Sequence, residues 1–105
     1  MSKIIGSNEF ENEIKEGIVI VDFFAEWCSP CKMLSPIFEE LGNEMEGKVK
    51  FIKVNVDESS DIASRYNISN IPAMLILKNG EEQEIAVGFS PKEVIRGRVE
   101  KYLIG

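Results

Sequence analysis

The sequence predicts an α/β domain, in which helices cover both faces of a central mixed β-sheet. Apolar residues alternate along the chain between strand-like and helix-like spacing, in the expected order β-α-β-α-β-α-β-β-α. Residues 18–24 form a near-continuous apolar run, which is typical of a strand covered on both faces. Because 105 residues suffice for one hydrophobic core, we expect a single domain over residues 1–105.

The first half of the chain predicts two helices around this strand. Ser7 is expected to cap a short helix that runs over residues 7–15. A longer helix is expected over residues 28–45, and Pro36 should kink it by removing one backbone hydrogen bond. The apolar residues of the longer helix fall on one stripe: Leu34, Ile37, Phe38, Leu41 and Met45.

The second half predicts three more strands. Residues 49–56 alternate like a strand, and a short helix follows over residues 60–66. A strand over residues 73–77 leads into Asn79-Gly80, a strong hairpin signal that predicts a return strand over residues 83–87. The opening strand of the expected order receives no residue range from the sequence.

The start of the last helix has a recognisable sequence signature. Ser90 is expected to cap it, Pro91 to take its first position and Glu93 to complete a capping box. Three apolar residues are expected to face the core: Ile95, Val99 and Leu103.

Composition favours a soluble, acidic, cytoplasmic monomer. The net charge is −6 and the basic residues are scattered, so we expect no nucleic-acid partner. No apolar run approaches the roughly 20 residues of a membrane span. The N-terminal segment has no apolar stretch long enough for a signal peptide.

The two cysteines, Cys28 and Cys31, are the first candidates for chemistry. A disulfide across three positions closes almost no loop, so a stabilising role is weak. In a reducing compartment such a pair is redox-active or binds metal. The chain has no histidine, which excludes a Cys/His zinc site within one chain but leaves a four-cysteine site across a dimer. Two buried, inert cysteines are the remaining alternative.

The placement of the pair at a helix start favours redox chemistry. Positions i and i+3 share one face of the first turn, and a helix N-terminus stabilises the nucleophilic thiolate. Cys28 follows Trp27 and is expected to be the exposed, attacking sulfur, whereas Cys31 lies one turn deeper and resolves the mixed disulfide. Pro30 suits a first helical turn because its φ is fixed.

Residues 21–32, Val-Asp-Phe-Phe-Ala-Glu-Trp-Cys-Ser-Pro-Cys-Lys, resemble the active-site segment of the thioredoxin family. The resemblance covers nearly the whole chain and implies the thioredoxin fold. It also implies a protein-disulfide reductase and electron carrier that needs no cofactor beyond the Cys28–Cys31 disulfide. The implied partners are disulfide-containing proteins and a thioredoxin reductase linked to flavin and NADPH or to ferredoxin. Further matching segments are Pro36, residues 53–57, residues 66–68, Ile71-Pro72, residues 78–80 and Val87-Gly88.

Asp22 interrupts the buried run of residues 18–24. A carboxylate there is costly unless it is protonated or paired, although a twist of the strand that exposes it is an alternative. The resemblance implies that Asp22 exchanges a proton with Cys31 and that Lys53 lies beside it. By sequence alone, Lys53 is a solvated lysine on one face of a strand.

The resemblance also implies a substrate-binding patch around Cys28, made by Trp27, Ile71, Pro72 and Gly88. By base rate the Ile71–Pro72 bond is trans, but thioredoxins carry a cis proline that faces the cysteines. The cis bend turns the backbone of Ile71 outward, where a substrate strand can pair with it. Without the resemblance, the sequence predicts that Trp27 and Ile71 are core residues and that Gly88 lies in a turn.

Four residues depart from the usual family pattern. Ser29 replaces a glycine between the cysteines, where its hydroxyl can bond the thiolate and make the pair slightly less reducing. Phe24 stands where many members have tryptophan. Asn70 and Ala73 flank Ile71-Pro72 in place of glycine and threonine, and we expect them to affect partner preference.

Three other functions agree less well with the sequence than the reductase does. Disulfide oxidases and isomerases often carry a histidine between the cysteines, whereas Ser29-Pro30 supplies no charge. A thioredoxin-like module that only binds a partner does not need the intact Cys28, Cys31, Asp22 and Pro72. Glutaredoxin activity is disfavoured because that motif usually places proline before tyrosine.

Overall fold

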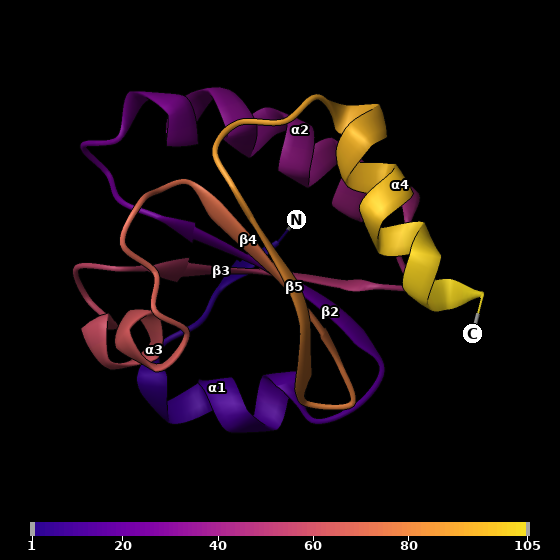
Figure 1. Ribbon diagram of the computed structural model, residues 1–105, viewed down its shortest axis with the longest axis horizontal. Helices are drawn as coiled ribbons and strands as arrows, with labels where there is room; N and C mark the ends of the chain where they lie inside the picture. The colour runs from indigo at the N-terminus through magenta and orange to yellow at the C-terminus, as the bar shows by residue number, and fades with distance from the viewer. Residues whose placement is uncertain (1, 105) are drawn as a thin grey trace.

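A computed structural model describes residues 2–104 of the chain, which form a five-stranded sheet and four helices (Figure 1). The sheet order is β1-β3-β2-β4-β5, with β1, β3 and β2 parallel and with β4 and β5 antiparallel to their neighbours. This arrangement confirms the predicted mixed sheet. The elements are β1 (Lys3–Ile4), α1 (Ser7–Ile14), β2 (Ile18–Phe24), α2 (Ser29–Glu44), β3 (Lys50–Asn55), α3 (Ser60–Arg65), β4 (Ala73–Lys78), β5 (Glu81–Val87) and α4 (Lys92–Leu103).

The helices cover the sheet in two pairs, with α1 and α3 on one face and α2 and α4 on the other (Figure 1). In β2, Val19, Val21 and Phe23 pack into the core beneath α1 and α3. Ile18 and Ile20 pack into the core beneath α2 and α4. Because successive strand residues alternate between faces, Asp22 points to the side of α2 and α4. The sequence thus aims one acidic side chain at the helix that carries the cysteines.

The N-terminal caps of α1 and α4 differ from the predicted ones. Gly6, not Ser7, is the N-cap of α1, and Ser7 is already helical. The hydroxyl of Ser7 instead donates to Asp61 at the start of α3. The N-cap of α4 is Pro91, whose backbone is extended and has no side-chain cap. Ser90 is therefore one position too early to cap the helix.

The predicted capping box of α4 and the predicted core position of Leu103 are also wrong. The Glu93 carboxylate pairs with Arg96 one turn along the same helix rather than with the N-cap. Ile95 and Val99 are buried as expected, whereas Leu103 is 39% exposed. Tyr102 takes its place against the core, because the apolar stripe continues three residues after Val99 rather than four.

The remaining elements lie within a residue or two of their predicted bounds. The Asn79-Gly80 hairpin is confirmed, with left-handed backbone at both residues (φ 51° and 83°). Its return strand, β5, begins two residues earlier than predicted. Pro36 lies inside α2 as expected. The two-residue β1 is the opening strand to which the sequence assigned no range.

Candidate functional site

The two cysteines lie where the turn after β2 enters α2. Cys28 is the N-cap of α2, and its Sγ accepts a hydrogen bond from the backbone N–H of Cys31 at 3.2 Å. Pro30 occupies the first turn, as its fixed φ predicts. The two sulfurs are joined in a disulfide, with the Cα atoms 5.3 Å apart. The backbone N–H of Cys31 at the helix start therefore faces the sulfur of Cys28, as an anion at that atom requires.

The expectation that Cys28 is exposed is wrong for the disulfide form. Cys28 and Cys31 are each only 4% exposed. They pack with Ala25 into a small apolar cluster against which Phe24 and Ile71 also lie. The difference between the two sulfurs is thus their position along α2 and not their burial.

Asp22 is fully buried, which excludes the alternative that a strand twist exposes it. Neither of its carboxylate oxygens has a hydrogen-bond partner within the described residues. Burial raises the pKa of Asp22 from 3.8 to about 7, the positive charge of Lys53 opposes this rise, and the negative charge of Glu39 adds to it. The carboxyl group therefore exchanges its proton near neutral pH.

Lys53 lies beside Asp22 in the sheet, as the resemblance implies. The two residues are register partners of β3 and β2. The Lys53 ammonium donates to Ser35 Oγ at 3.0 Å and stands 4.9 Å from the centre of the Phe24 ring. These contacts replace an ion pair with Asp22, which is absent between these two described side chains. A pocket of about 340 Å³ opens here, lined by Phe24, Ala25, Glu26, Cys31, Lys32, Ser35 and Lys53.

The loop before β4 brings Ile71, one of the predicted patch residues, against the cysteines. The Ile71–Pro72 bond is cis, as the resemblance implies. Ile71 is half-buried against the cluster of Cys28 and Cys31. The Gly88 N–H donates to the Pro72 carbonyl at 2.8 Å, and Gly88 has a φ of 95°, which favours glycine. Two loops distant in sequence are thereby tied together at this end of the sheet.

Trp27 is 70% exposed and is not a core residue. Its indole Nε1–H donates to Asp57 Oδ2 at 2.8 Å, so the ring is held on the surface by a residue that follows β3. Sequence reasoning did not single out Asp57, although a tryptophan N–H usually needs an acceptor. Of the four departures from the family pattern, Ser29 and Asn70 are exposed, Phe24 is half-buried and Ala73 is buried.

Sequence reasoning also missed Ser35. It lies four residues after Cys31, so the two side chains share one face of α2. A serine that follows a cysteine at this spacing was the available signal.

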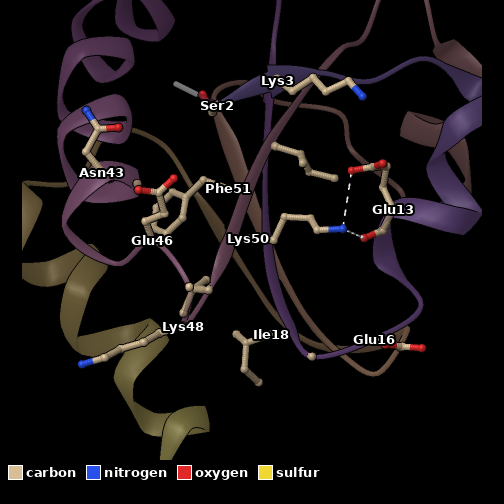
Figure 2. Close-up of a pocket in the computed structure, with 15 residues that line it drawn as sticks. Ser2, Lys3, Glu13, Glu16, Ile18, Asn43, Glu46, Lys48, Lys50 and Phe51 are labelled. Atoms are coloured by element: carbon tan, nitrogen blue, oxygen red, sulfur yellow. Dashed lines mark hydrogen bonds and ion pairs between the residues drawn. The ribbon is translucent and has the colours of Figure 1, made fainter.

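A second pocket, of about 520 Å³, lies at the other end of the sheet, near the start of β3 and the end of α2 (Figure 2). Its charged groups include Lys50, which donates to the Glu13 carbonyl at 2.9 Å and pairs with the Glu13 carboxylate. The cysteines do not line this pocket. Over residues 2–104, no helix is long and apolar enough to cross a membrane, and no group of three or more acidic, cysteine or histidine residues is placed to hold a metal ion.

Comparisons with known proteins show which family this chain resembles over its length. A family model described as thioredoxin matches residues 2–101. The chain is 48% identical to a thioredoxin of Bacillus subtilis over 94 residues, which cover 90% of each chain. It is 41% identical to a thioredoxin of Staphylococcus saprophyticus over 101 residues, or 96% of each chain. A solved structure of Plasmodium falciparum thioredoxin superposes with a TM-score of 0.88 at 37% identity and covers 97% of this chain and 99% of that one.

Proposed function

Since this chain belongs to the thioredoxin family and is a protein-disulfide reductase, we propose that Cys28 attacks the substrate disulfide and that Cys31 releases the product. The Cys28 thiolate forms a mixed disulfide with one substrate sulfur, and the other substrate sulfur leaves as a thiolate. The Cys31 thiolate then attacks the Cys28 sulfur, so the Cys28–Cys31 disulfide forms and the second substrate thiolate leaves. Two electrons pass from the cysteine pair to the substrate.

The observation that carries this assignment is the backbone N–H of Cys31 on the sulfur of Cys28, at the N-cap of α2. An N–H donor and the helix dipole both favour a negative charge at that sulfur. Cys31 lies inside the first turn of α2, so its sulfur is not at the positive N-terminal end of the helix dipole. Cys28 is therefore the sulfur that ionises first.

We expect the Cys28 thiol of the reduced protein to titrate well below the free value of about 8.5 and near 7, a value known for thioredoxins. A Cys31→Ser variant isolates the Cys28 thiol, and the rate of its alkylation against pH measures the pKa. A Cys28 pKa at or above 8.5 contradicts the role given to the helix start.

Asp22 acts in this proposal as the proton acceptor and donor for Cys31. Its pKa of about 7 allows the carboxyl group to give and take a proton at neutral pH. Lys53 contributes a positive charge that limits the rise of that pKa. The pocket lined by Cys31 and Lys53 gives solvent a path to this part of the site.

The substrate contacts the apolar patch made by Trp27, Ile71, Pro72 and Gly88. Exposure of the Trp27 ring and the contact of Ile71 with the cysteine cluster support this assignment. An extended segment of the substrate pairs with the backbone at Ile71. The clients are proteins that carry a disulfide.

The cellular setting completes the proposal. A thioredoxin reductase, linked to flavin and NADPH or to ferredoxin, returns the Cys28–Cys31 disulfide to the dithiol, so the protein carries electrons between two partners. The acidic chain works as a cytoplasmic monomer, for which its net charge of −6 provides solubility. The cysteine pair is the redox group, and no further cofactor enters the proposal.

A further inference from the structure

Ser35 is a polar side chain that the exchange reaction does not use directly. It lies on the same face of α2 as Cys31, one turn further along the helix. Both residues line the pocket of about 340 Å³ beside Lys53. Its Oγ is 3.0 Å from the ammonium of Lys53, and the ring of Phe24 lies near the same ammonium. The hydroxyl and the ring therefore fix the end of an otherwise flexible side chain.

The position of the Lys53 ammonium matters because no hydrogen bond from the described residues compensates the burial of the Asp22 carboxylate. Its two oxygens are buried without a hydrogen-bond partner in the described residues. Lys53 is its register partner in the sheet and points to the same face. In a weakly polar interior, the energy between two charges depends strongly on their separation. If the Lys53 ammonium moves from the pocket into solvent, most of its electrostatic interaction with Asp22 is lost.

We propose that Ser35 is a positioning residue, whose hydroxyl holds the Lys53 ammonium in the pocket so that its charge faces Asp22 and Cys31. The proposal rests on the function proposed above, in which Asp22 exchanges a proton with Cys31. Ser35 touches neither the substrate nor the reacting sulfurs in this role. It acts through Lys53 alone.

Other charged groups also face Asp22 or its pocket. Glu39, on α2, raises the pKa of Asp22. Its carboxylate is held by the backbone N–H and the hydroxyl of Ser2, which are independent of Ser35. Glu26 and Lys32 line the pocket from the turn after β2 and from α2. None of these groups bonds Ser35, so a change at Ser35 reaches Asp22 through Lys53.

The test is a carbon-13 NMR titration of the Asp22 carboxyl group in the oxidised protein, where the joined cysteines do not titrate. Replacement S35A frees the ammonium to move into solvent and raises the pKa of Asp22 by roughly 0.5–1 unit. The variant S35T keeps the hydroxyl and the parent value. The control S64A removes an exposed serine from α3 and changes nothing.

The pair of variants S35A and K53M identifies the route of the effect. Replacement K53M raises the pKa of Asp22 at least as far as S35A, and adding S35A to K53M causes no further rise. Three results overturn the proposal: an unchanged pKa in S35A, a lower pKa in S35A, or the same S35A shift in the absence of Lys53. A failure of the proposed proton transfer gives a different result. The variant Asp22→Asn then keeps full activity, while S35A still shifts the pKa of Asp22 in the protein that retains this residue.

Discussion

Replacement of Cys28 with serine abolishes the reduction of protein disulfides, with an expected loss on the order of 10³-fold or more. The serine hydroxyl is not ionised near neutral pH, so it cannot attack a disulfide sulfur as a thiolate does. The N–H of Cys31 that faces the Cys28 sulfur then has no anion to stabilise. The measurement is the rate of insulin reduction with dithiothreitol as electron donor.

The companion variant Cys31→Ser separates the two steps of the exchange. It keeps the Cys28 thiolate and attacks the substrate, but it cannot release it, so it accumulates as a mixed disulfide. Trapped partners are visible on non-reducing gels, and the double serine variant is the control. Trapping by Cys28→Ser and not by Cys31→Ser reverses the assignment of the two sulfurs.

Replacement of Asp22 with asparagine stabilises the protein at alkaline pH and has little effect near pH 4. The pKa of Asp22 is about 7 in the folded chain and 3.8 as a model value for the unfolded chain. The folded state thus binds the proton more tightly, and the parent loses stability as the pH rises from about 4 to about 7. The loss is on the order of 4 kcal/mol at most, and an amide does not suffer it.

Denaturant unfolding of the oxidised proteins at pH 4.5 and pH 8.5 measures this difference. The stability gained by Asp22→Asn over the parent grows between the two values of pH. The control is Glu46→Gln, at an exposed residue that lines the pocket away from the cysteines, and it shows no such growth. Equal gains at both values of pH mean that the Asp22 carboxyl group does not titrate between them.

The same variant slows catalysis near neutral pH, by roughly 10-fold or more, because an amide cannot exchange a proton with Cys31. If Asp22→Asn is fully active and more stable than the parent, Asp22 lowers the stability of the fold and has no catalytic role. Insulin reduction at pH 7 under the same conditions as for the cysteine variants supplies the rate.

The sequence was sufficient for the fold and for the chemical centre, because those features depend on local patterns. The apolar run of residues 18–24 required a strand covered on both faces, and β2 is that strand. An aspartate inside the run left two possibilities, burial or exposure through a twist of the strand, and the structure shows that Asp22 is buried. Cys28 at the predicted helix start became the N-cap.

The features that could not be predicted depend on distances between elements. Whether Cys28 is exposed is decided by the packing of Ala25 and Ile71, which come from different loops. The bond between Lys53 and Ser35 joins β3 to α2, and nothing in the local pattern of either residue requires it. The predicted cap of α4 was wrong by one residue, because the backbone of Pro91 is extended and the helix starts one residue later than expected.

The reduction potential of the Cys28–Cys31 pair tests the central claim most directly, because it separates a reductase from an oxidase or isomerase. Equilibration with reduced and oxidised glutathione, followed by acid quenching and separation of the two forms, gives the potential. For a reductase we expect a value near that of thioredoxins, about −270 mV. A value between about −180 and −120 mV, the range of isomerases and oxidases, contradicts the account.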